Sequence, residues 1–302
     1  METKQRIASI LKANCLDFSI TGLPTFNLSE LDLVKELEFQ LPNNIRLGHL
    51  VEKIVSELIK SSSNYKVLYE NIQIIDGKKT IGEIDFIIED LNTKTLIHME
   101  LAYKFYLFDP TISSEPINKW IGPNRNDSLN EKLDKLKRKQ FPLLYHSGTK
   151  SKFNTIEIDE VSQYLCLLAS LFIPYEYKAS FSPIYKKAIR GYYLNFDTFK
   201  SFDNTEKKYY IPSKKEWGMD PSENNSWTNF DSVKKQITTS VKEKQSPLCW
   251  QKYKNSYLLN EIYRVVAMRL IVENTLFFFF CYGDHRDLNG SEHSFPTRRS
   301  SD

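Results

Sequence analysis

The chain has 302 residues, of which 41% are hydrophobic and 26% are charged, and its net charge at neutral pH is +3. This composition excludes a chain that is disordered throughout, and it provides enough apolar residues for a large core. The small net charge does not indicate a nucleic-acid-binding protein by itself, so such a function must rest on local patches of charge.

Cysteine spacing and hydropathy narrow the class of protein further. The sequence has no C-x-x-C pair, which argues against a zinc site or a disulfide framework, and we expect reduced thiols. It has no uncharged apolar run of about 18 residues, and its first residues lack the apolar segment of a secretory signal. We therefore expect a cytoplasmic protein with no membrane segment. The four cysteines are Cys15, Cys166, Cys249 and Cys281.

The N-terminal part of the sequence predicts helices. Residues 1–45 are expected to form a helical extension, with short helical patterns over residues 5–13 and 28–39 that Gly and Pro interrupt. A stripe of apolar residues then predicts a longer amphipathic helix over residues 47–60. This helix is expected to pack against an apolar surface.

Three strands are predicted next, over residues 65–75, 80–89 and 95–107, with an Asp-Gly turn between the first two. In the third strand the odd positions are uniformly apolar, whereas the even positions include a histidine, a glutamate and a lysine. Because side chains alternate along a strand, one face of the hairpin is apolar and the other is polar. Polar groups there should be solvated, paired or bound to a metal. The polar face carries Asp85, His98, Glu100 and Lys104.

A basic helix follows the strands. The capping box Ser128-Leu129-Asn130-Glu131 predicts its start, and it should end before Pro142. Lys and Arg outnumber Asp and Glu by eight to three across residues 123–154. The basic residues are candidates for contacts with nucleic-acid phosphates, although a solvated helix face explains them equally well. These candidates are Lys132, Lys135, Arg138 and Lys139.

The remaining elements are less distinctive. A continuous apolar run over residues 164–173 predicts a buried strand. A short strand is predicted over residues 208–211, and helices are predicted over residues 231–242 and 258–272. No repeat or linker divides residues 46–275, so we expect one domain there.

The C-terminal residues are interpreted separately. Residues 293–302, HSFPTRRSSD, resemble the translation of a DNA-sequencing adapter, and residues 282–288, YGDHRDL, resemble the upstream part of the same oligonucleotide. We expect residues 276–302 to be an artefactual or disordered tail that adds nothing to the core. A short natural polar tail is the alternative.

The order helix, strand, acidic strand, strand with Glu and Lys, and basic helix resembles the PD-(D/E)XK nuclease superfamily. The resemblance covers residues 45–275 and implies an α/β fold in which helices flank a mixed central sheet. Four segments resemble, more narrowly, a bacterial family of domains of unknown function assigned to this superfamily. They are Leu47-Gly48 with Glu52, Gly82-Glu83-Ile84-Asp85-Phe86, ELAYKFY from Glu100 to Tyr106, and Trp120-Ile121-Gly122-Pro123.

By motif, the resemblance makes Asp85 the first acidic residue, Glu100 the second and Lys104 the lysine. The usual pattern places lysine two residues after the second acid, where this chain has Ala102. Lys104 keeps the same strand face, but its side chain begins about 6 to 7 Å farther along the strand.

The resemblance implies a nuclease that uses Mg²⁺, or Mn²⁺, to hydrolyse phosphodiester bonds in DNA or RNA. Asp85 and Glu100 would hold the ion, and the Lys104 ammonium would stabilise developing charge. Glu52 and Glu83 are further candidate ligands, although an exposed helix acid and a strand-end acid are equally good interpretations. A catalytically silent module of the same fold, which binds nucleic acid or a protein partner, is the alternative function.

Several residues on or near the polar face have weaker assignments. His98 is more often a packed or hydrogen-bonded residue at such a position than a ligand. Gln140 and Tyr145, at the end of the basic helix, are candidate accessory residues because they resemble a glutamine and a tyrosine of one nuclease branch. Without a metal, Asp85, Glu100 and Lys104 would form a cross-strand salt bridge.

Overall fold

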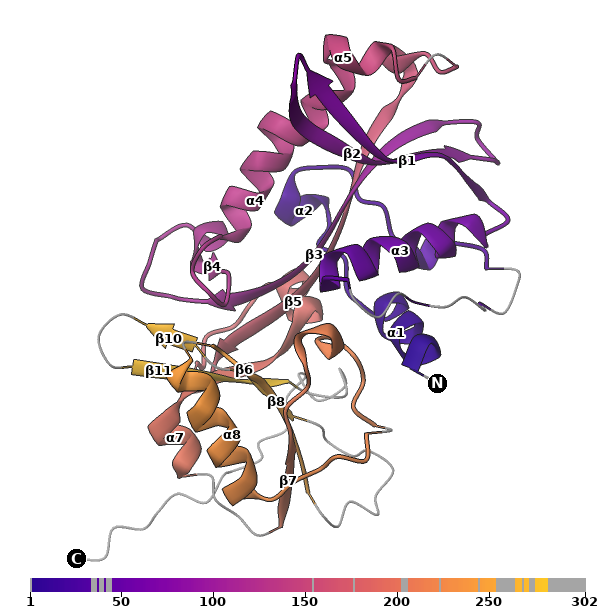
Figure 1. Cartoon of the computed structure of the whole chain (residues 1–302). Helices are drawn as coiled ribbons and strands as arrows, with labels where there is room; N and C mark the ends of the chain where they lie inside the picture. Colours follow the sequence, from indigo (N-terminus) through magenta and orange to yellow (C-terminus); the bar gives the residue numbers. More distant parts are fainter. Residues whose placement is uncertain are drawn as a thin grey trace, which may run out of the picture.

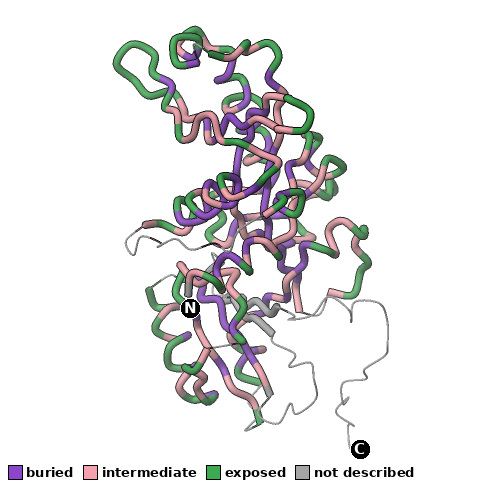
Figure 2. Tube along the Cα trace, turned by 90° about the vertical axis from the view of Figure 1, so that its right-hand side faces the viewer, coloured by how far each residue is buried: buried purple, intermediate pink, exposed green. Residues whose placement is uncertain are grey.

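The computed structural model describes residues 2–33, 37, 41, 45–153, 155–175, 177–201, 206–222, 224–243, 245–253, 264–267, 269–271 and 275–281. Over these residues the chain is a mixed α/β structure in which helices flank a mixed central sheet (Figure 1). Buried residues follow the central strands, and exposed residues lie on the outer loops (Figure 2).

The sheet begins with three antiparallel strands, as the alternating pattern predicts. Its path within the described residues is β1-β2-β3-β5-β6-β9-β8-β7, in which the last four strands are β6 (Ile189–Asn195), β9 (Arg264–Ala267), β8 (Leu248–Tyr253) and β7 (Lys207–Tyr210). β3 pairs antiparallel with β2 but parallel with β5, so the chain between β3 and β5 must cross over the sheet. The first strands are β1 (Tyr65–Asp76), β2 (Lys79–Asp90), β3 (Leu96–Phe108), the short β4 (Trp120–Ile121) and β5 (Ser162–Pro174).

Two helical layers cover this part of the sheet on opposite faces (Figure 1). α3 (Leu47–Lys60) packs its apolar stripe against Phe86, Ile97 and Met99. The crossover helix α4 packs against Ala102 and Tyr106 from the other side. The crossover comprises η2 (Pro116–Lys119), α4 (Leu129–Lys135), the π-helical turn η3 (Leu136–Gln140), η4 (Phe141–Tyr145), α5 (Ser147–Lys150) and η5 (Ile158–Glu160).

The N-terminal segment covers the edge of β5 that β3 and β6 leave open. The Leu16 amide donates to the Leu167 carbonyl at 2.9 Å, and the Phe26 amide donates to the Leu165 carbonyl at 3.0 Å. The helix predicted over residues 5–13 is confirmed, and the described residues at the start of the pattern over 28–39 form a single 3-10 turn. The elements are α1 (Glu2–Leu11), α2 (Phe18–Thr21) and η1 (Leu28–Glu30).

The C-terminal half extends the sheet. The predicted strands over residues 164–173 and 208–211 and the predicted helix over 231–242 are confirmed. The strand over 208–211 and the helix over 231–242 pack with Phe199 in a second cluster of buried residues that includes Tyr209 and Val233. The elements are α6 (Pro183–Ala188), β6 (Ile189–Asn195), α7 (Phe196–Lys200), β7 (Lys207–Tyr210), η6 (Lys214–Glu216), α8 (Phe230–Lys242) and β8 (Leu248–Tyr253).

The helix predicted over residues 258–272 is wrong. The described residues of this segment form strands β9 (Arg264–Ala267) and β10 (Arg269–Ile271). β9 pairs with both β6 and β8, so the sheet satisfies its backbone groups on two sides. The sequence RVVAMRLIV is rich in apolar residues but carries Arg264 and Arg269, and periodicity alone does not separate a helix from a strand in so short a segment.

The sheet also reaches into the segment predicted to be a tail. β11 (Thr275–Cys281) pairs antiparallel with β6 and with β10. Residues 282–302, which include the adapter-like sequences, lie outside the described residues.

The hairpin of β1 and β2 is kinked where it passes the predicted site. Asn71 has a φ of +55°, in the left-handed region, and lies between the register pairs Glu70↔Phe86 and Ile72↔Ile84. Phe86 packs on the α3 side, whereas Ile84 packs with a cluster on the other side that contains Leu143. The strict alternation that the sequence predicts for β2 is therefore interrupted opposite Asn71.

Candidate functional site

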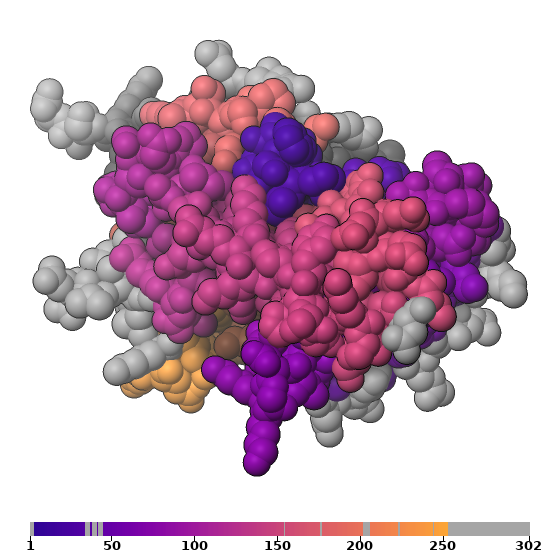
Figure 3. Space-filling view, turned by 90° about the horizontal axis from the view of Figure 1, so that it is seen from above, coloured from indigo at the N-terminus to yellow at the C-terminus, as the bar shows by residue number. Residues whose placement is uncertain are grey.

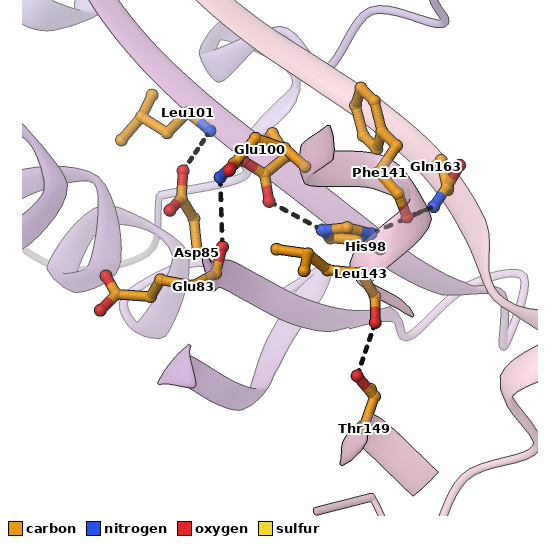
Figure 4. A network of polar contacts seen from close by, with 10 residues as sticks. Glu83, Asp85, His98, Glu100, Leu101, Phe141, Leu143, Thr149 and Gln163 are labelled. Atoms are coloured by element: carbon orange, nitrogen blue, oxygen red, sulfur yellow. Dashed lines mark hydrogen bonds and ion pairs between the residues drawn. The ribbon is translucent and has the colours of Figure 1, made fainter. Parts of the chain in front are cut away.

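Asp85 and Glu100 meet where β2 and β3 separate. The last β2–β3 register pair at this end is Phe86↔Met99, so the next two residues, Asp85 and Glu100, face each other just beyond it. The Asp85 Oδ2 atom accepts a hydrogen bond from the Leu101 amide at 2.9 Å (Figure 4). The Asp85 side chain thus accepts the hydrogen bond of a β3 amide that lies beyond the last backbone pair with β2.

Glu100 is held in a buried polar network on the face that the sequence predicts to be polar. Its exposed fraction is 1%, and that of His98 is 0%. Glu100 Oε1 lies 2.9 Å from His98 Nε2, and Gln140 Nε2 donates to Glu100 Oε2 at 3.3 Å (Figure 4). Gln163 Nε2 contacts His98 Nδ1 at 3.3 Å and donates to the Phe141 carbonyl at 2.8 Å. The crossover helices therefore bury this end of the polar face and satisfy it with hydrogen bonds.

The two carboxylates repel each other in a poorly solvated place. Burial raises the pKa of Asp85 well above its ordinary value, and the charges of Glu100 and Glu52 raise it further. The hydrogen bond from Leu101 and the charge of Lys132 act in the opposite direction. A proton or a cation at this point would relieve the repulsion.

Lys104 does not bind either carboxylate. Its Nζ atom lies 2.7 Å from Asp127 Oδ2, in a half-exposed ion pair. Asp127 belongs to a tight loop in which the Gly122 amide donates to the Asp127 carbonyl at 2.7 Å. Lys104 keeps the predicted face of β3, but its ammonium is held on the side of this loop.

Lys132 of α4 interacts electrostatically with both carboxylates. The residue is half-buried, in contrast to its exposed neighbours Lys135 and Lys139. Burial lowers the pKa of Lys132, and so does the charge of Lys104, whereas Asp85 and Glu100 raise it. One basic residue of this helix is therefore within electrostatic reach of the two carboxylates.

The two other predicted acidic residues line a hollow to which Asp85 does not contribute. Glu52 of α3 and Glu83 of β2 both line this hollow, whose volume is about 360 Å³. Glu52 Oε2 lies 2.9 Å from His49 Nδ1, and the Glu83 carbonyl accepts from Gln140 at 3.3 Å. The left-handed residue Asn71 lines the hollow as well. Backbone strain of this kind often accompanies functional sites.

The remaining predicted residues lie on the outer surface. Arg138 pairs with Asp134 of the preceding turn at 2.6 Å. Tyr145 is 53% exposed at the end of η4, away from the Glu100 network, whereas the accessory candidate Gln140 lies within it. Seen from above, the segment from α4 to α5 occupies the middle of this face of the molecule (Figure 3). Lys135, Arg138 and Lys139 are therefore available to a partner on this surface.

Sequence patterns did not identify two residues of the site. Gln163 reaches His98 because β3 and β5 are parallel neighbours in the register His98↔Gln163. Asp127 reaches Lys104 through the loop before α4. A parallel register between strands about 65 residues apart leaves no periodic signal in the sequence, although the Asn126-Asp127-Ser128 context of the cap does mark a loop.

The two carboxylates fit a hard divalent ion that takes only one or two of its ligands from the protein. Among the residues that the structure describes, no three His, Cys, Asp or Glu side chains are grouped so that they could hold a metal ion. Mg²⁺ commonly binds proteins through one or two carboxylates and takes its other ligands from water and substrate phosphates. Asp85 and Glu100 meet this requirement as a pair, because their negative charges repel each other and a cation between them would relieve the repulsion.

The cap of α4 can be tested by its stability. Ser128 Oγ accepts from the Glu131 amide at 3.2 Å, as the capping box predicts. We expect Ser128→Ala to lower the free energy of unfolding by about 1 kcal/mol, because one amide at the helix start loses its partner. Asn229→Ala, which removes the corresponding cap of α8, is the matched control and should cost a similar amount in urea unfolding. A loss near zero for Ser128→Ala alone would show that α4 does not need this cap.

None of the helices in the described residues has the length and apolar character that a membrane crossing requires.

The family model of a domain of unknown function (DUF1853) matches residues 20–267. The comparison with curated proteins finds no match, and neither does the comparison with solved structures. The family match includes α3, the three antiparallel strands, the crossover and the carboxylate pair. The chain therefore belongs to the DUF1853 family.

Proposed function

We propose that the chain is a nuclease that depends on Mg²⁺ or Mn²⁺ and hydrolyses phosphodiester bonds in DNA or RNA, with Asp85 and Glu100 as the metal ligands. The observation that carries the proposal is the position of these two carboxylates, which face each other at the end of the β2–β3 ladder. Burial and the charge of Glu100 raise the pKa of Asp85. A cation bound between the two carboxylates would therefore be stabilised by both charges.

The order of elements supports the same proposal. A helix, three antiparallel strands, a crossover helix and a parallel strand occur here as α3, β1, β2, β3, α4 and β5. This order agrees with the one that a PD-(D/E)XK nuclease core implies. The acidic residues lie on β2 and β3, the strands that carry the motif in that resemblance.

The residues of the site would have different roles in the proposed reaction. A bound divalent ion would polarise a phosphoryl oxygen and lower the pKa of a bound water. Glu100 is fixed by His98 and Gln140, so its carboxylate loses little further freedom on binding. Asp85 has one oxygen bonded to Leu101, which orients the other. The exposed Lys135, Arg138 and Lys139 would attract the phosphate backbone in a salt-dependent manner.

A catalytically silent module that binds nucleic acid or a protein partner remains the second candidate. Two observations favour it. The position of the usual lysine holds Ala102, and Lys104 is bound to Asp127. In such a module, Asp85 and Glu100 would be the remains of an ancestral metal site.

A cleavage assay with a panel of single- and double-stranded DNA and RNA, in Mg²⁺ and in Mn²⁺, tests the proposal. We expect cleavage by the wild type and none by Asp85→Asn or Glu100→Gln, because each variant removes a ligand charge. Either ion should also raise the melting temperature of the wild type by a few degrees, since it binds only the folded state. Asp231→Asn, an exposed acid on α8, is the control and should behave as the wild type.

Two results would reject the nuclease proposal. The first is an absence of metal-dependent cleavage on every substrate. The second is a metal-induced rise in melting temperature that persists unchanged in both ligand variants. Binding of nucleic acid without cleavage would support the silent module.

A further inference from the structure

The Lys104 ammonium is poorly placed for the role that the sequence pattern gives it. Its bonded partner is Asp127, 2.7 Å away, and both side chains are about one-third exposed. Asp127 is fixed in turn by the loop that closes at Gly122. To approach Glu100, Lys104 would have to give up this ion pair and bend back along its own strand.

The packing of α4 explains why position 102 does not hold a lysine. Ala102 is buried in one cluster with Leu129 and Leu133 of α4. A lysine there would place a charge beneath the helix, where it would be desolvated. The small side chain lets α4 approach the polar face of β3 closely. The lysine that the usual pattern places at position 102 of the strand can therefore be replaced in its role by a lysine on α4.

Lys132 has the position for this replacement. It precedes the buried Leu133 and lies one turn before the buried Leu136, and Gln140 follows one turn later. Residues four apart lie on one side of a helical run, so Lys132, Leu136 and Gln140 form a row. The last member of the row bonds to Glu100 at 3.3 Å. The row therefore runs along the helical segment from Gln140, at the Glu100 carboxylate, to Lys132, which lies beside the helix residues that pack on Ala102.

The charges agree with this placement. Lys132 is half-buried, while the next basic residues of the helix, Lys135 and Lys139, are exposed. Burial and the charge of Lys104 lower the pKa of Lys132, whereas the charges of Asp85 and Glu100 raise it. Lys132 is therefore coupled electrostatically to both carboxylates of the site.

We infer that Lys132, rather than Lys104, supplies the ammonium group that completes the Asp85–Glu100 site. The catalytic part of this inference rests on the proposed nuclease function. In that reaction the ammonium stabilises negative charge on the phosphate in the transition state, and it repels a metal ion rather than binding it. In the protein without metal, the same ammonium compensates the half-buried Asp85 and the buried Glu100.

Cleavage kinetics test the catalytic part. We expect Lys132→Ala to lower the cleavage rate on the order of 100-fold or more, because a preorganised charge beside the phosphate acts in the transition state. Lys132→Arg should rescue poorly, since a planar guanidinium does not place a compact charge at the same point. Lys104→Ala should cause a smaller loss than Lys132→Ala. Lys234→Ala is the matched control, because Lys234 is also half-buried beside an inward-facing helix residue, Val233, on α8, and should cleave at the wild-type rate.

A double-mutant cycle in metal-free buffer tests the placement without any activity. We expect Lys132→Met to lower the urea midpoint of the wild type but to lower it less in the Asp85→Asn background, where the ammonium has lost a partner. Lys104→Met should shift the midpoint equally in the two backgrounds, because its partner is Asp127.

The outcomes separate the inference from the proposed function. If the wild type cleaves and Lys132→Ala cleaves as fast as Lys234→Ala, the catalytic assignment is overturned. If the wild type cleaves nothing, the nuclease proposal fails, and the cycle alone decides whether Lys132 is the cation of the site. Coupling of Asp85 to Lys104 that exceeds its coupling to Lys132 would overturn the placement.

Discussion

Asp85→Asn is expected to abolish cleavage and, in metal-free buffer at neutral pH, to raise the free energy of unfolding on the order of 1–3 kcal/mol. The substitution removes a buried negative charge that faces Glu100. The amide oxygen of asparagine can still accept the hydrogen bond from the Leu101 amide, so the strand contact is kept. Urea unfolding in the presence of EDTA measures the gain, and the cleavage assay measures the loss.

The pH dependence of this gain has a definite sign. Burial and Glu100 raise the pKa of Asp85 in the folded state above its unfolded value, which is about 3.9. Between these two values the folded state holds more protons than the unfolded state, so wild-type stability falls as pH rises through this window. The advantage of Asp85→Asn should therefore be small below pH 4, grow as pH rises, and be complete above the folded pKa.

A control and a contradictory outcome complete the test. Asp231→Asn removes an exposed carboxylate from α8 and should change stability by less than about 0.5 kcal/mol at any pH in this range. An Asp85→Asn variant that is less stable than the wild type at neutral pH without metal would mean that the carboxylate forms a stabilising ion pair. That result would favour a structural salt bridge over a metal site.

The sequence predicts the carboxylate pair because its cause is local. Strand alternation places Asp85 and Glu100 on the polar side of their strands, and the short turn between the strands fixes the antiparallel register that brings them together. The start of α4 is also local, since Ser128 caps the helix within three residues. Stripes of apolar residues likewise give α3 and β5 correctly.

Features that depend on distant parts of the chain are not visible in these patterns. The bond between Lys104 and Asp127 depends on the path of the loop before α4, and the contact between Gln163 and His98 depends on a parallel register. The kink at Asn71 is a positive φ at a residue other than glycine, which strand alternation does not predict. The helix predicted over residues 258–272 is wrong because strand pairing with β6 and β8 determines that segment.

His98→Ala is expected to lower the free energy of unfolding by about 3–5 kcal/mol, because it removes a fully buried ring and leaves a buried carboxylate without one of its hydrogen bonds. The fully buried ring bonds to Glu100 at 2.9 Å and packs edge-on against Phe141 at 5.3 Å between ring centroids. Its removal leaves a cavity and takes one of the two hydrogen-bond donors from Glu100, which keeps the amide of Gln140. Urea unfolding measures the loss, and cleavage should fall because Glu100 is no longer held in place.

The chain contains its own control for this substitution. His49 also bonds to a glutamate, Glu52, at the same distance of 2.9 Å, but its side chain is 66% exposed. Because surface ion pairs contribute little, His49→Ala should cost less than about 1 kcal/mol. A second substitution, Glu100→Gln, should recover part of the stability lost in His98→Ala, since it removes the uncompensated charge. Equal small losses in His98→Ala and His49→Ala would show that Glu100 does not depend on His98, and the network would then not be what positions the site.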